Sequence, residues 1–174
     1  PGCRPLYVLA EKILGQGERL SPRWAIQGTT GYEFLNLIGG LFVDGAHGKP
    51  MSAAYAAFTG DRTPWPDLVY DCKRLILDVS MSSELAVLGH ALSRLAQCNR
   101  HSRDCTLRSL VHALGEVVAC FPVYRTYVTA EEDVSIQDRA CVEVAVAFAK
   151  QRNPATSASI FDFVRNTLLR RPPE

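Results

Sequence analysis

Apolar residues along this chain follow two patterns, short unbroken runs and helical spacing, with turn-forming residues between them. The run "YVLAEKIL" at 7–14 lies between a proline and a glycine and predicts a strand over 5–13. The β-branched and aromatic run "CFPVYRTYV" predicts a second strand over 120–128. Glycine and other turn formers fill 14–31, which we expect to be a long loop.

Most of the remaining chain has the spacing of amphipathic helices, in which apolar residues recur every three or four positions. The predicted helices cover 32–43, 52–59, 67–79, the segment that follows "SMSS" at 80–83, the segment that follows Thr106, 135–152 with Ser135 as its N-cap, and 159–170. We expect the apolar faces of the longer helices to pack against each other or against a neighbouring layer.

Each of the longer helices has one apolar face that we expect to be buried. In chain order, these faces are Leu68, Cys72, Leu75, Ile76 and Val79; Leu85, Leu88, Leu92, Leu95 and Ala96; Leu107, Leu110, Val111, Leu114, Val117 and Val118; and Ala140, Val144 and Phe148.

Two strands separated by helices predict an α/β protein built from βα units of a parallel sheet or barrel. Two strands alone cannot complete such a sheet, so we expect its other strands to lie outside this chain. The chain begins with "PGCRPLYVLA", which has neither an initiator methionine nor the basic-then-apolar pattern of a secretory signal. We therefore expect an internal piece of a longer protein.

Composition narrows the classes of partner. The chain has 174 residues, of which 47% are hydrophobic and 21% charged, as in an ordinary globular domain. A formal net charge of +1 gives no reason to expect a nucleic acid or an anionic membrane as partner. No apolar stretch approaches the roughly 20 residues that span a bilayer.

The six cysteines are scattered along the chain and form no CxxC pair. Such a distribution is typical of a reduced, cytosolic protein, although an even number leaves disulfides open. The segment "CNRHSRDC" brings Cys98, His101 and Cys105 close together in sequence, with His112 further on. Their spacing lacks the paired knuckle of a zinc site, so we favour a solvated, Arg-rich turn and expect no metal.

Glu11 is the one feature of the first predicted strand that burial does not explain. A carboxylate on a buried strand is costly unless it has a partner or a function. From the residues alone, an ion pair with Lys12 or Arg19 is favoured over a catalytic role as the explanation of Glu11. Alternation along a strand places Lys12 on the opposite face from Glu11, which favours a structural role for Lys12.

Six segments in order along nearly the whole chain carry a family resemblance. They are "AEKILGQGERL", "IQGTTGYEFLNLIGGLFVD", "RDCTLRSL", "CFPVYRTYV", "SIQDRA" and "FDFVRNTLLRR". This set resembles the maltooligosyltrehalose synthase family within the α-amylase-type glycoside hydrolases, family 13. The resemblance implies a fragment of a (β/α)8 TIM barrel that carries two barrel strands and a mostly α-helical insertion. The implied parts are 1–31, a strand with a catalytic Glu and its loop; 32–119, the insertion; and 120–174, a strand and the following helices.

The resemblance also implies an activity and a role for Glu11. The family's general acid/base is the Glu of "EKIL" at the carboxyl end of a barrel strand, and that position here is Glu11. The implied enzyme is an intramolecular transglucosylase that converts the reducing-end α-1,4 linkage of a maltooligosaccharide to an α,α-1,1 trehalose linkage. Retention requires two carboxyl groups about 5 Å apart. Motifs for the nucleophile and the third carboxylate are absent from this chain, so we expect the fragment alone to be inactive.

Further expectations follow for the site and for the parent enzyme. The substrate-binding candidates are Tyr32, Tyr124, Arg125 and Tyr127. Tyr32 is expected either to stack on a sugar or to anchor a turn. Arg125 is expected to bind a sugar or a catalytic carboxylate, or instead to pair with Asp138 or Glu131. The parent is expected to be a monomeric cytoplasmic enzyme that uses a maltooligosaccharide substrate and no cofactor.

Two other functions stay open at this point. One is a different family 13 enzyme, an α-glucan hydrolase or transferase, against which the motifs argue by resemblance only. The other is a non-catalytic helical interaction module, which predicts a self-contained core and a chain that folds alone. The enzyme hypothesis predicts strands whose edges have no neighbour, and therefore a fragment that aggregates or stays partly unfolded.

Overall fold

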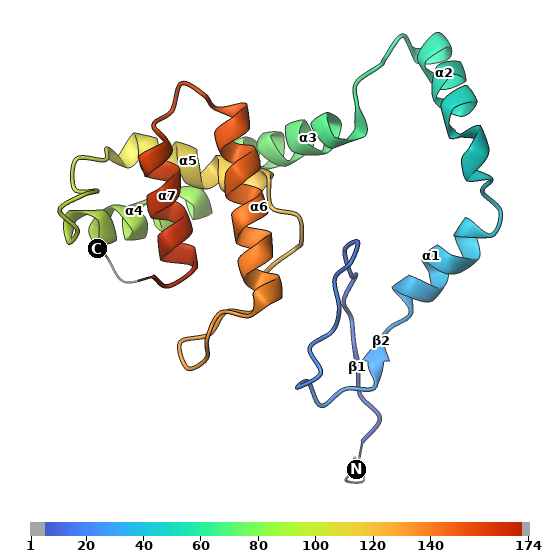
Figure 1. Cartoon of the computed structure of the whole chain (residues 1–174). Helices are drawn as coiled ribbons and strands as arrows, with labels where there is room; N and C mark the ends of the chain where they lie inside the picture. Colours follow the sequence, from blue (N-terminus) through green and yellow to red (C-terminus); the bar gives the residue numbers. More distant parts are fainter. Residues whose placement is uncertain (1–5, 172–174) are drawn as a thin grey trace. The chain divides into compact units, whose positions relative to one another are not determined.

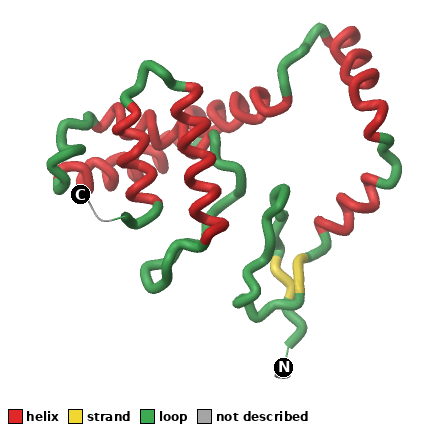
Figure 2. Tube along the Cα trace, viewed as in Figure 1, coloured by secondary structure: helices red, strands yellow, loops and turns green. Residues whose placement is uncertain are grey.

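The computed structural model describes residues 6–171. The chain divides into two compact units, Pro1–Thr63 and Pro64–Glu174. Among residues 6–171, strands occur only in the first unit, and the second consists of helices and loops (Figure 2). The first unit contains β1 (Leu9–Ala10), β2 (Gly28–Thr29), α1 (Tyr32–Gly40), the 3-10 turn η1 (Gly45–His47) and α2 (Gly48–Thr59).

β1 and β2 form a parallel pair in which Leu9 is opposite Gly28 and Ala10 opposite Thr29. The pairing continues beyond the strands, because Thr30 N donates to Ala10 O at 3.1 Å. The strand predicted over 5–13 is therefore confirmed only at its centre, and its Pro5 lies outside the described residues. The segment 14–31 is mostly loop, as expected, but it also supplies the partner strand, which the sequence pattern missed.

The two helices of the first unit lack a buried core. α1 starts after Gly31, whose φ of 105° favours glycine, and α2 is followed by Gly60, which has a φ of 74°. Neither helix has a buried residue. Large apolar side chains on them are therefore exposed, among them Leu37 at 72% and Phe58 at 92%.

The second unit is a bundle of five helices among the described residues. They are α3 (Trp65–Val79), α4 (Ser82–Gln97), α5 (Leu107–Ala119), α6 (Ile136–Arg152) and α7 (Ala158–Leu168). α5 contacts the other four helices and forms the centre of the bundle, with α6 and α7 side by side across it (Figure 1). The predicted cap is confirmed, since Asp138 N donates to Ser135 Oγ at 3.0 Å.

The core of this bundle is built from small and branched side chains. Its fully buried members of largest volume are Phe161, Leu110, Val117, Val142 and Val164. α4 and α5 approach closely at Gly89, where an added Cβ would lie 2.3 Å from Val111 Cγ2. The absence of a side chain at Gly89 therefore sets the spacing between these two helices.

Two of the predicted apolar faces are wrong. On α3, Leu75 and Val79 are 60% and 71% exposed, and the helix buries Leu77 instead. On α6, Val144 and Phe148 are 43% and 52% exposed, while the face that enters the core is Val142, Ala145, Val146 and Ala149. α6 is apolar on both faces, so its periodicity alone does not show which face is covered. The expected faces of α4 and α5 are confirmed in part, at the positions Leu85, Leu92, Ala96, Leu110, Leu114 and Val117.

The strand predicted over 120–128 is also wrong, because no strand forms in this segment. A strand requires a neighbouring strand for its backbone groups. Here side chains instead of a neighbouring strand form hydrogen bonds with the backbone of the segment. Lys73 Nζ donates to Phe121 O at 2.8 Å, and Tyr127 N donates to Asp138 Oδ1 at 3.4 Å. The predicted α/β fold class is therefore confirmed only in part. The described chain is mostly helical with two short parallel strands, and the barrel stays a prediction.

No single helix within residues 6–171 is long and apolar enough to cross a membrane. α3 and α4 satisfy the length and composition requirements only as a pair, and they are bent by 85° at the break between them.

Candidate functional site

Glu11 directly follows β1, at the carboxyl end of that strand, and Tyr32 begins the helix that follows β2. Because the carboxyl ends of parallel strands lie at the same edge, the two side chains come together across 21 positions of sequence. The Tyr32 hydroxyl donates to Glu11 Oε1 at 3.3 Å. Glu11 is exposed, although the sequence pattern predicted a buried strand around it.

The start of α1 is fixed by a compact set of polar contacts beside Tyr32. Thr29 Oγ1 accepts a hydrogen bond from Gly31 N at 3.2 Å and donates to the Glu33 carboxylate. The hydrogen bond from Thr29 holds the pKa of Glu33 below its usual value. These contacts tie the end of β2 to the first turn of α1, and thereby orient Tyr32 toward Glu11.

Lys12 and Glu18 form an ion pair on the other side of Glu11. Lys12 Nζ lies 2.7 Å from Glu18 Oε1, and the two side chains are only 9% and 6% exposed. Glu18 Oε2 also accepts a hydrogen bond from Gly15 N at 2.8 Å, and Glu18 N donates to Gly15 O at 3.0 Å. Gly17, with a φ of 77°, allows the tight turn between them.

The electrostatics of Glu18 reflect this arrangement. Burial on its own raises the pKa of Glu18, but the hydrogen bond and charge of Lys12 and the hydrogen bond from Gly15 outweigh it, and the pKa lies below the usual value. Lys12 is thus paired with Glu18. This pair agrees with the structural role expected for Lys12.

The other substrate-binding candidates lie in the second unit. Tyr124 is 92% exposed, and Tyr127 lies beneath the Arg125 guanidinium, whose carbon is 4.8 Å from the ring centroid. Arg125 Nε donates to Thr126 O at 3.2 Å. In the described part of the chain Arg125 makes no ion pair with an acidic side chain, so the expected pairs with Asp138 and Glu131 are not observed. Their binding of substrate stays a prediction.

A buried acid that the hydrophobic pattern did not indicate joins three helices. Glu116 on α5 is 3% exposed, and its Oε2 accepts from Tyr70 Oη of α3 at 2.6 Å and from Asn153 Nδ2, just after α6, at 2.7 Å. Arg74 Nε lies 3.4 Å from its Oε1. The Arg152 guanidinium stacks on Tyr70 at 4.2 Å from the ring centroid. α3 is thus attached to the bundle largely through polar groups.

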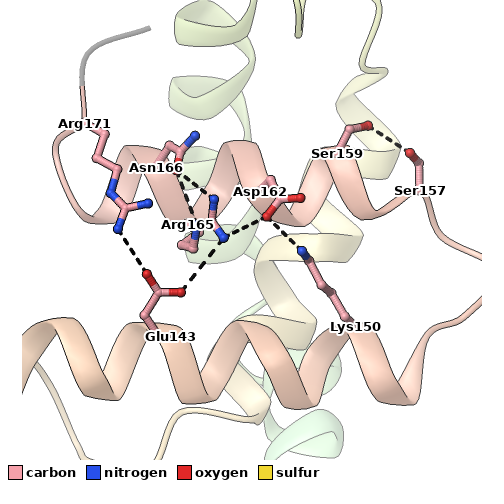
Figure 3. Close-up of polar contacts among 8 residues, drawn as sticks. All are labelled: Glu143, Lys150, Ser157, Ser159, Asp162, Arg165, Asn166 and Arg171. Carbon is pink, nitrogen blue, oxygen red and sulfur yellow. Dashed lines mark hydrogen bonds and ion pairs between the residues drawn. The ribbon is translucent and has the colours of Figure 1, made fainter. Parts of the chain in front are cut away.

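A pocket of about 490 Å³ lies between the loop that follows α4 and one face of α7. Its lining includes His101, Asp162, Phe163 and Asn166. Figure 3 shows that Asp162 belongs to a chain of ion pairs between α6 and α7, with Lys150 Nζ at 2.8 Å and Arg165 Nη1 at 3.0 Å from its Oδ1. The Asp162 carboxylate is held by these structural ion pairs. We therefore favour the Glu11 site over this pocket as the candidate functional site.

The alternative zinc site is not formed in the part of the chain that the structure describes. Within residues 6–171, no three His, Cys, Asp or Glu side chains lie close enough together to hold a metal ion. Five cysteines of that part of the chain form no disulfide: Cys72, Cys98, Cys105, Cys120 and Cys141. Among them, Cys72 and Cys98 are exposed.

Comparison with known proteins gives a partial match. Two curated proteins, from two strains of Mycobacterium tuberculosis and each named "Putative maltooligosyl trehalose synthase", are 27% identical to this chain over 116 residues. The match covers 67% of this chain and 15% of each relative. No family model matches the chain. The chain thus spans only a small part of the length of these relatives, and the predicted resemblance is confirmed as a partial similarity.

A solved structure gives a corresponding match in fold. The structure named DSM5389 glycosyltrehalose synthase matches 95% of this chain with a TM-score of 0.59 and 24% sequence identity. The match covers 19% of that protein. The mostly helical arrangement with two short parallel strands is therefore the fold of one part of a glycosyltrehalose synthase.

Proposed function

We propose that this chain is the part of a longer maltooligosyltrehalose synthase-type enzyme that carries its general acid/base, Glu11. The observation that carries the proposal is the position of Glu11 at the carboxyl end of a parallel strand, with the Tyr32 hydroxyl 3.3 Å from its carboxylate. Active sites of barrel enzymes lie at that end of the strands. The partial similarity to maltooligosyl trehalose synthases supports the same assignment.

In the proposed reaction Glu11 acts twice. It first donates a proton to the glycosidic oxygen as the bond from C1 to the terminal glucose breaks, while a carboxylate elsewhere in the complete protein bonds to that C1. The released glucose reorients without leaving. Its anomeric hydroxyl then attacks C1, gives its proton to Glu11 and frees the carboxylate, which yields the α,α-1,1 linkage. Water must be excluded during this step, because its attack would give hydrolysis.

Several features of the proposal concern the complete enzyme. Packing of further barrel strands over the edge of β1 and β2 would half-bury Glu11, as a general acid requires. Tyr32 keeps the carboxyl oriented through its hydroxyl and leaves its ring free to stack on a sugar. Tyr124, Arg125 and Tyr127 are proposed to contact substrate. The 174 residues alone carry one of three required carboxylates and are expected to be inactive. The complete enzyme is proposed to be cytoplasmic and monomeric and to need no cofactor.

The test uses the complete reading frame and a short maltooligosaccharide. Reducing ends and free glucose are followed together for the unchanged protein, for Glu11→Gln and for Glu84→Gln, an exposed glutamate on α4 that serves as the matched control. The proposal predicts loss of reducing ends without equivalent glucose release, abolished by Glu11→Gln and retained by Glu84→Gln. A gain of reducing ends would instead identify a hydrolase.

One observation favours a second candidate, a non-catalytic helical interaction module. The unit Pro64–Glu174 has its own apolar core, as such a module requires. Against it stands the first unit, whose helices bury no residue and which contains the Glu11 site. Unchanged sugar chemistry in Glu11→Gln, or none in any form of the complete protein, would favour the module.

A further inference from the structure

The backbone on either side of Glu11 is fixed by separate contacts. On one side, Ala10 belongs to the ladder with β2, and its carbonyl accepts from Thr30 N at 3.1 Å. On the other side, Lys12 is held by its ion pair with Glu18 at 2.7 Å. The Glu11 side chain itself is exposed. The surroundings thus constrain the main chain of Glu11 while leaving its carboxyl group accessible.

The ion pair is built more firmly than an ordinary surface pair. Both side chains are more than nine-tenths buried, and Glu18 is also anchored to Gly15 by a side-chain and a backbone hydrogen bond. Exposed pairs contribute little, and a buried pair seldom adds net stability over an apolar replacement. A better-supported use of a buried pair is to select one local conformation. Here that conformation is the turn 15–18 and the position of the strand end.

We propose that Glu18, acting through Lys12, is a positioning residue that fixes the place of Glu11 in the reaction. This inference rests on the proposed function, since it concerns the same site. Loss of the Glu18 charge leaves Lys12 buried without that partner, so the turn 15–18 rearranges and the adjacent Glu11 backbone shifts with it. Displacement of a reacting group by about 1 Å costs on the order of 100-fold in rate.

The displacement has different consequences for the two possible acceptors. A bound glucose has a fixed hydroxyl, so a displaced Glu11 removes its proton poorly. A water molecule is small and mobile and adjusts to the displaced base. Loss of the ion pair is therefore expected to reduce isomerisation more than hydrolysis. The ratio of the two products is a property of each active molecule and does not depend on how much of the enzyme is folded.

The experiment compares Glu18→Gln, Lys12→Met and their double variant in the complete protein, with Glu84→Gln as the exposed control. We expect each single variant to lower the isomerisation rate by about 10- to 100-fold, with little change in KM and a several-fold higher share of free glucose. The double variant should lose no more than either single one, because the two residues act as one unit. Circular dichroism of each variant reports its folded fraction.

Three results would overturn the inference. Wild-type rate and product ratio in Glu18→Gln would show that the pair does not position Glu11. A lower rate with an unchanged product ratio would show that the pair only supports folding. Absence of isomerisation in both the unchanged protein and Glu84→Gln would refute the proposed function, and this inference with it. The unchanged protein thus separates the last case from the first two.

Discussion

Removal of the Glu116 carboxylate is expected to detach α3 from the bundle. In the folded chain Glu116 accepts from Tyr70 Oη at 2.6 Å and Asn153 Nδ2 at 2.7 Å, and it lies 3.4 Å from Arg74 Nε. Glu116→Ala leaves all three donors without this acceptor and opens a cavity. Breaking a buried charged pair in this way costs about 3–5 kcal/mol. Glu116→Gln keeps the volume and one oxygen, and should cost about 2 kcal/mol through the contact with Arg74.

Urea unfolding of the helical unit Pro64–Glu174, which has its own apolar core, measures this loss through the helical circular dichroism signal. With an m-value of about 1–2 kcal/mol/M, Glu116→Ala should lower the midpoint by about 2 M or more. Glu84→Ala, an exposed glutamate in the first turn of α4, is the control and should cost no more than about 1 kcal/mol. A loss below about 1 kcal/mol in Glu116→Ala would refute the reasoning, since the buried acid would then be dispensable.

The titration of Tyr70 gives an independent check of the same cluster. Burial, followed by the hydrogen bond and charge of Glu116, raises the pKa of Tyr70 to about 12, from an ordinary value of 10.0. Because the folded-state pKa is the higher one, this contribution to stability is complete below pH 10 and is lost as the pH rises through about 12. Phenolate absorbance, with Tyr70→Phe to identify the signal, should show a lower pKa in Glu116→Gln. An unchanged pKa would contradict the contact.

Three further predictions concern the second unit. Gly89→Ala should destabilise the chain by about 1–2 kcal/mol, because the overpacking cost against Val111 exceeds the gain in helix propensity; adding Val111→Ala should recover part of the loss, and additive losses would contradict the clash. Ser135→Ala should cost about 1 kcal/mol in urea unfolding through loss of the α6 cap, and no loss would show that the cap is unimportant. Burial and then the Glu116 charge raise the pKa of the Cys120 thiol, so iodoacetamide should modify Cys120 more slowly than the exposed Cys72; equal rates by peptide mapping would contradict this.

Local sequence signals predicted most helices well, because each depends on nearby residues. The Ser135 cap and the glycine after the second helix of the first unit have local causes. The buried face of α6 could not be predicted from its periodicity, since Val142 and Val144 are equally apolar and only the neighbouring helices decide between them. The attachment of α3 depends on Glu116, which is buried although it is charged. A hydrophobic pattern predicts burial only for apolar residues, so it could not predict this contact.

The sequence pointed to Glu11 as the central residue of the candidate site, but it did not predict the contacts that Glu11 makes. A carboxylate within an apolar run needs an explanation, which singled out Glu11, but its catalytic role was implied only by the family resemblance. Its contact with Tyr32 depends on the pairing of two very short strands, for which the sequence signal is weak. The contact of Glu18 was not predicted, because the expected partner of Lys12 was the adjacent Glu11. Opposite charges six positions apart across a glycine-rich turn were the signal that indicates the Lys12–Glu18 pair.

The most direct test of the central claim separates protonation of the leaving group from all other roles of Glu11. A maltooligosyl fluoride loses fluoride as an anion, so cleavage of its C–F bond needs no general acid. In the complete protein, Glu11→Gln should therefore retain a first-turnover burst of fluoride close to that of the unchanged protein. Isomerisation of the ordinary maltooligosaccharide should fall by about 10²- to 10⁴-fold. Equal loss on both substrates, or no loss on either, would contradict the assignment of Glu11 as the acid/base.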